Sequence, residues 1–127
     1  MKYFANVEGT VYTVDFEDNE TAENIKRRSP LTLKLVGGNE FEKCATLPFI
    51  LQCEKGKNHG KVKIGDLVLF GDKTLVLFCS SCVTKDSFVP IAHFDCGEGL
   101  DWRISKRKKV ELNLSAVKDD QAKETTM

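Results

Sequence analysis

Apolar and polar residues alternate along most of this chain, in short runs that are separated by turn residues. The clearest run is LTLKLV at positions 31–36, where three leucines occupy every second position. This period of two is typical of a strand with one buried face. Similar runs predict about eight strands, which lie at 2–16 (a hairpin around Glu8-Gly9), 31–36, 40–47, 61–79 (two strands around Gly71-Asp72-Lys73), 87–94 and 109–117. Residues 52–60 are predicted to form a polar loop.

One short segment, EDNETAENIKRR at 17–28, departs from this pattern. Asn19 or Thr21 can cap a helix there, acidic residues lie in its first turn and basic residues lie in its last. Ser29-Pro30 ends the segment because proline cannot continue a helix. The pattern predicts a helix over about 20–28. Short strands, frequent turns and one helix together predict a mainly β protein, built as an antiparallel barrel or sandwich.

Length and charge narrow the functional classes. A chain of 127 residues fits one domain with its own core. Its 19 basic and 19 acidic residues balance, which argues against general affinity for nucleic acid or an anionic membrane. No stretch approaches the ~20 consecutive apolar residues of a membrane-spanning helix.

Cysteine content and the two ends of the chain bear on location and domain limits. The N-terminus alternates rather than forming the apolar core of a signal peptide, and the five cysteines are an odd number. Both features favour reduced thiols in the cytoplasm. We expect one domain over 1–115 and a disordered polar tail over 116–127.

An ordered set of motifs resembles the small cyclophilin-like domains of bacteria and archaea. Residues 21–25, TAENI, are similar to the TAENF signature of cyclophilins. The family's other motifs, in order, are similar to EDN at 17–19, PLTL at 30–33, GDLVLFG at 65–71, LVLF at 75–78 and HFDCGEGL at 93–100. The resemblance covers roughly residues 3–115. It implies a closed eight-stranded barrel with one short helix, in a family whose function is usually unassigned.

The resemblance also implies a surface for ligands, on the outer wall formed by residues 31–46 and 66–79. Cyclophilins place an arginine beside the prolyl nitrogen, and this stretch has none; Lys34 is the only base near that position. By the resemblance, Val76 and Phe78 point into the barrel and Leu77 points to the groove, with Lys34 and Phe41 at its border. The ordinary alternatives are that Lys34 and Leu77 are exposed strand residues without a role.

We therefore expect a peptide- or protein-binding module with a degenerate, non-catalytic proline cleft, whose partner is a proline-containing peptide or protein. We expect no cofactor. The alternative from the same resemblance is an active peptidyl-prolyl isomerase.

A third hypothesis comes from four possible zinc ligands. Cys79, Cys82, His93 and Cys96 have the spacing C-x2-C-x10-H-x2-C, and tetrahedral zinc accepts three thiolates and one imidazole. The spacer between the second and third positions is short and includes the strand-like SFVPIA. We therefore favour buried, metal-free cysteines with a hydrogen-bonded histidine, and keep a small zinc-stabilised interaction domain as the alternative.

Overall fold

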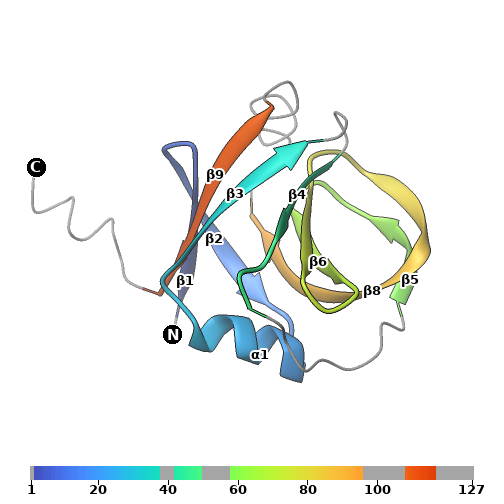
Figure 1. Cartoon of the computed structure of the whole chain (residues 1–127), viewed down its shortest axis with the longest axis horizontal. Helices are drawn as coiled ribbons and strands as arrows, with labels where there is room; N and C mark the ends of the chain where they lie inside the picture. The colour runs from blue at the N-terminus through green and yellow to red at the C-terminus, as the bar shows by residue number, and fades with distance from the viewer. Residues whose placement is uncertain (1, 38–41, 50–57, 96–107, 117–127) are drawn as a thin grey trace, which may run out of the picture.

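The computed structural model describes residues 2–37, 42–49, 58–95 and 108–116 of the chain. In these residues the chain forms one helix and nine strands (Figure 1). In chain order they are β1 (Tyr3–Val7), β2 (Thr10–Phe16), α1 (Glu20–Arg27), β3 (Leu31–Gly37), β4 (Glu42–Thr46), β5 (Asn58–Val62), β6 (Asp66–Phe70), β7 (Thr74–Phe78), β8 (Cys82–Phe94) and β9 (Lys109–Ser115).

Eight of these strands close into an antiparallel barrel. Their order is β2-β1-β9-β3-β4-β7-β6-β8, and β8 pairs back onto β2 through Val14–Phe16 and Ala92–Phe94. Closure removes the free edges of the barrel sheet. The prediction of a closed eight-stranded β-barrel with a single short helix is confirmed.

The ninth strand, β5, lies outside this closed ring of strands. It pairs only with the first half of β8 among the described residues, from Val62 opposite Cys82 to Asn58 opposite Phe88. Figure 1 shows β5 and this part of β8 on the side of the molecule away from β1 and β9. The predicted loop at 52–60 was therefore wrong over residues 58–60, and the segment 61–79 contributes to three strands instead of two.

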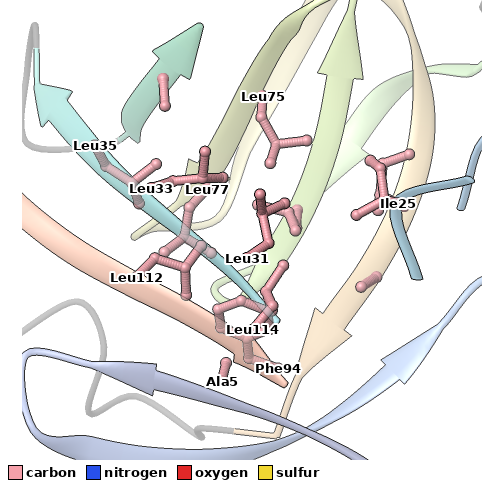
Figure 2. Close-up of a cluster of buried hydrophobic side chains, with 14 of the residues drawn as sticks. Ala5, Ile25, Leu31, Leu33, Leu35, Leu75, Leu77, Phe94, Leu112 and Leu114 are labelled. Atoms are coloured by element: carbon pink, nitrogen blue, oxygen red, sulfur yellow. The ribbon is translucent and has the colours of Figure 1, made fainter. Parts of the chain in front are cut away.

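The barrel interior holds the main core. Leucines from β3, β7 and β9 meet there, together with Phe94 of β8 and Ile25 of α1 (Figure 2). Many of these side chains are fully buried, including Leu35, Leu75, Leu77, Leu112 and Phe94. At about 25 cal/mol per Å² of apolar surface removed from water, this cluster is the main source of the stability of the fold.

The helix begins and ends as its sequence predicts. The Asn19 side-chain oxygen accepts a hydrogen bond from the Ala22 backbone N–H at 2.7 Å, so Asn19, and not Thr21, is the cap. The Asn19 amide also donates to the Pro90 carbonyl of β8, at 2.8 Å. The cap therefore joins α1 to β8 at a bulge, where the register of the β6–β8 pair shifts.

Among the described residues, no helix has both the length and the apolar character needed to cross a bilayer. The predicted tail over 116–127 lies outside the described residues except for Ala116.

Candidate functional site

The two faces of β7 lie opposite to the sequence-based expectation. Leu77 has no exposed surface and points into the barrel, where Figure 2 shows it near Leu33 and Leu112. Val76 and Phe78 point outward instead, into a second apolar cluster. The expectation that Leu77 borders an external groove is wrong, because the leucines of β7 complete the interior layer formed by the leucines of β3 and β9.

Lys34 does not lie beside Leu77 either. Lys34 is exposed on β3 and stands opposite Glu111 of β9 in the strand register, whereas Leu77 lies inside the barrel. Phe41 lies outside the described residues. The expected trio therefore does not share one surface.

A second cluster of apolar side chains covers the outer wall of the barrel over β6 and β7. Its buried members are Val62, Val68, Val76, Phe78 and Phe88, and Cys44, Phe70 and Cys82 pack against them. The rings of Phe70 and Phe88 meet edge to face with centroids 5.8 Å apart. β5 and the first half of β8 thus fold over the wall and exclude water from its centre.

This cover leaves a groove of about 550 Å³ between the wall and the start of β8. One side of the groove is formed by β4, β6 and β7, and the other by β8. Its lining residues are Glu42, Cys44, Phe70, Thr74, Val76, Phe78 and the continuous stretch 82–86. The volume lies within the range of about 300–1,000 Å³ that is typical of ligand pockets.

The strand pairings define two ends of this groove. At one end, Glu42 stands opposite Phe78 in the β4–β7 register, and β8 begins four residues later at Cys82. At the other end, Phe70 stands opposite Thr74, and Phe70 touches Phe88 of β8. β8 therefore runs along the groove from the Glu42 end towards the Phe70 end.

Charge is unequal along the groove. Glu42 is the charged lining residue at the first end, whereas Lys85 and Asp86 are neighbours of opposite charge towards the second end. Burial of the Cys82 side chain and, secondarily, the negative charge of Glu42 raise the pKa of the Cys82 thiol above its ordinary value. Cys82 is therefore a neutral thiol in this groove at neutral pH, and Glu42 is the acidic side chain nearest to it among the residues that line the groove.

A model of the cyclophilin-like family matches residues 5–115. The chain belongs to the cyclophilin-like family. A comparison with curated proteins found no match.

The groove of this cyclophilin-like domain shares residues with the ranges in which the resemblance placed a ligand surface, although none of its lining residues is in β3. Residues 31–46 and 66–79 were expected to form the wall, and six of the lining residues come from within these ranges. Sequence reasoning missed the individual residues, above all Val76 and Phe78, because it placed the opposite face of β7 outward. The contribution of β8 was also missed, since VTKD at 83–86 has no apolar alternation.

Three residues of the zinc hypothesis, Cys79, Cys82 and His93, lie in different parts of the domain. Cys79 is fully buried in the main core and Cys82 lies in the outer groove. His93 is on the outer wall, with its Nδ1 atom 2.7 Å from the Asp66 carboxylate. Cys96 lies outside the described residues.

Within the described part of the chain, no three histidine, cysteine or acidic side chains are grouped closely enough to hold a metal ion. Asp66 is itself fixed, because its second oxygen accepts from the Lys63 backbone N–H at 2.9 Å. His93 and Asp66 therefore form a hydrogen-bonded pair on the barrel surface.

Proposed function

We propose that this domain is a peptide-binding module whose ligand lies in the outer groove. The observation that carries the proposal is an apolar groove on the outer wall of β4 and β7, floored by Val76 and Phe78. The interior of the barrel is filled by leucines, so a ligand must bind outside it. A groove with an apolar floor and a few charged residues at its rim suits a short peptide segment.

The same groove argues against efficient proline isomerisation. Catalysis of this rotation requires stabilising a twisted amide across a barrier of ~18–20 kcal/mol. No arginine is found among the described residues that line the groove, and its one basic side chain, Lys85, is on β8 instead of the central wall. A point charge on a flexible stem does not replace the planar donor fork of arginine. We therefore propose binding without catalysis, with a proline-containing peptide or protein as the partner.

An NMR titration tests the site. The probes are the hexapeptide acetyl-Thr-Val-Thr-Val-Thr-Lys-amide and the same peptide with proline at its third position. We expect backbone amide shifts to concentrate on residues 42–44, 74–78 and 82–86. Shifts that concentrate around Lys34 on the β3–β9 face, or no shift with either peptide, would overturn the proposal.

Blocking variants provide the matched control. Cys44→Phe and Thr74→Trp place a large ring in the groove from β4 and β7, and we expect each to reduce binding at least about tenfold. Val11→Phe adds a ring at another exposed strand position, where 39 % of the side chain is accessible, and should leave binding unchanged. Equal binding by the three folded variants would show that the peptide does not use the groove.

A proline-isomerisation assay tests the absence of catalysis. We expect little acceleration over the uncatalysed rate, which takes tens to hundreds of seconds at 25 °C. A rate constant typical of an efficient isomerase, lost in Cys44→Phe, would identify the domain as an enzyme instead.

A further inference from the structure

We propose that the peptide binds as an added β-strand along the edge of β8 from Cys82 to Asp86, antiparallel to β8, with a basic residue near its C-terminal end. This inference rests on the proposed function and specifies how the groove is occupied and by which class of peptide.

The first observation is that five consecutive residues of β8 line the groove. Side chains of a strand point alternately to its two faces, so a hollow on one face would touch every second residue. Contact with 82, 83 and 84 in turn, where β8 pairs regularly with β5, is what a groove along the edge of the strand gives. The β5–β8 register then shifts between Thr84 and Phe88, and this bulge also brings 85 and 86 to the groove. The edge carries the backbone N–H and C=O groups that pair with another strand.

The second observation is that this edge has no neighbouring strand in the described part of the chain. β5 pairs with one edge of β8, through Val62 with Cys82, Lys61 with Val83 and Gly60 with Thr84. β6 pairs with β8 only over Val89–His93, because it ends at Phe70 and turns into β7. Among the described residues, the groove-side edge between Cys82 and Asp86 therefore has no strand paired with it, which is the condition for strand addition by an extended peptide.

The second end of the edge is closed by a local hydrogen bond. The Thr84 hydroxyl donates to the Asp86 carbonyl at 2.9 Å, which occupies that acceptor. The open edge is thus about five residues long, or roughly 17 Å at 3.4 Å per residue. A peptide of five or six residues fills it.

The apolar floor supplies a rule for the side chains. In an added strand, every second side chain points towards the outer wall, where Cys44, Phe70 and Thr74 are partly exposed, and the intervening ones point to solvent. Small β-branched residues at alternate positions fit this floor. Proline is tolerated only where the peptide N–H points away from β8, because proline has no N–H to donate to the edge.

Charge supplies the direction. Antiparallel pairing is somewhat more stable than parallel pairing. β8 runs away from the Glu42 end, so an antiparallel peptide runs towards it and places its C-terminal residues beside Glu42. A lysine or arginine there meets an acidic side chain, whereas at the other end it meets Lys85 as well as Asp86.

Two peptides of identical composition test the direction. We expect acetyl-Thr-Val-Thr-Val-Thr-Lys-amide to bind about two- to fivefold more tightly than acetyl-Lys-Thr-Val-Thr-Val-Thr-amide, which corresponds to one exposed ion pair. Glu42→Gln should abolish this preference, and Glu111→Gln on β9 should preserve it. Equal binding of the two peptides to the unaltered domain, or tighter binding of the second, would overturn the direction.

Backbone N-methylation of the first peptide, one residue at a time, tests strand addition. Methylation removes one donor and leaves the side chains unchanged. We expect losses of about two- to tenfold at alternate residues, which is the worth of one hydrogen bond, and little change at the residues between them. The alternation is its own control, since a general effect of methylation would not have a period of two.

The outcomes separate the two proposals. Groove binding with a flat methylation profile would overturn strand addition and leave the peptide-binding function standing. Absence of binding by every peptide would overturn both.

Discussion

The inner and outer faces of β7 are both buried, yet the inner face lies in the closed core and the outer face lies beside a groove. Leu75 and Leu77 on the inner face have no exposed surface, and Val76 and Phe78 on the outer face are 4 % and 1 % exposed. The inner face is enclosed by eight strands that close on one another. Among the described residues, β5 and the first half of β8 cover the outer face and leave a groove beside them.

The difference shows how a small barrel forms an outer groove without hollowing its core. A closed barrel of eight strands is filled by its own side chains. Here one long strand extends from the barrel wall: β8 pairs with β6 and β2 in its second half and with β5 in its first half. The extension folds over an apolar wall, and the incomplete contact between the two forms the groove.

The variant with the largest expected effect disrupts packing on the inner face. Leu77→Ala should lower the free energy of unfolding by about 2–5 kcal/mol, because it leaves a cavity in a fully packed interior. Val36→Ala, at a β3 side chain that is 46 % exposed, should change it by less than about 0.5 kcal/mol. Urea denaturation measures both. A loss below about 1 kcal/mol for Leu77→Ala would contradict its inward placement.

Some strands of this barrel could be predicted from the sequence more fully than others. The β1–β2 hairpin, β3 and α1 could be predicted because each carries a local signal: a Glu-Gly turn, strict alternation and a capped amphipathic segment. Glu8 and Gly9 indeed adopt positive φ values of 51° and 93°, as a tight two-residue turn requires. The order of motifs then indicated the closed barrel.

The groove could not be predicted to the residue, because its strands carry no directional signal. In LVLF at 75–78 every position is apolar, so alternation cannot distinguish the inner face from the outer. β5 contains Asn58 and Gly60, which favour turns, and becomes a strand through its pairing with β8. Such distant pairing is a tertiary effect that a local pattern does not contain.

A second variant tests packing on the inner face, where Lys43 is buried. Lys43 of β4 is only 2 % exposed, and it stands opposite Gly37 of β3 in the strand register. A Cβ atom on Gly37 would lie 2.5 Å from Lys43 Nζ and 2.7 Å from its Cδ. Gly37→Ala should therefore destabilise the domain by about 1–3 kcal/mol, through overpacking against a buried side chain.

A double-mutant cycle identifies the cause. In a Lys43→Ala background the added methyl group has room, so Gly37→Ala should cost less there by about 1 kcal/mol or more. Thermal or urea unfolding of the four proteins gives this coupling energy. The same cost in both backgrounds would mean that the contact with Lys43 is not the reason for glycine at this position.

A third variant acts on the second half of β8. Asn19 caps α1 and also donates to the carbonyl of Pro90, at the bulge within the part of β8 that pairs with β6. Asn19→Ala should cost about 1–2 kcal/mol, through loss of the cap and of one hydrogen bond. Asn19→Asp keeps the acceptor for Ala22 but lacks the amide donor, so its unfolding free energy should be intermediate. An aspartate variant as unstable as the alanine variant would show that the bond to Pro90 dominates.

The smallest expected effect probes the charge at the outer groove. Burial and the Glu42 carboxylate raise the pKa of Cys82, so less thiolate is present at a given alkaline pH than in an unfolded chain. The pH at which alkylation of Cys82 by iodoacetamide reaches half its maximal rate should therefore be higher in the folded domain than in a denatured one. Fragment ions in tandem mass spectrometry locate the label at Cys82, which shares a tryptic peptide with Cys79.

A Glu42 variant then separates the two causes of the raised Cys82 pKa, which are burial and the Glu42 carboxylate. Glu42→Gln should move this midpoint only part of the way down, because burial is the larger cause and the carboxylate the smaller. Glu111→Gln, on the opposite wall at β9, should leave it unchanged. Slow alkylation from steric cover alone would lower the maximal rate without moving the midpoint. A midpoint unaffected by Glu42→Gln would place this carboxylate too far from Cys82 to attract a basic peptide residue into the groove, and would count against the direction proposed for the added strand.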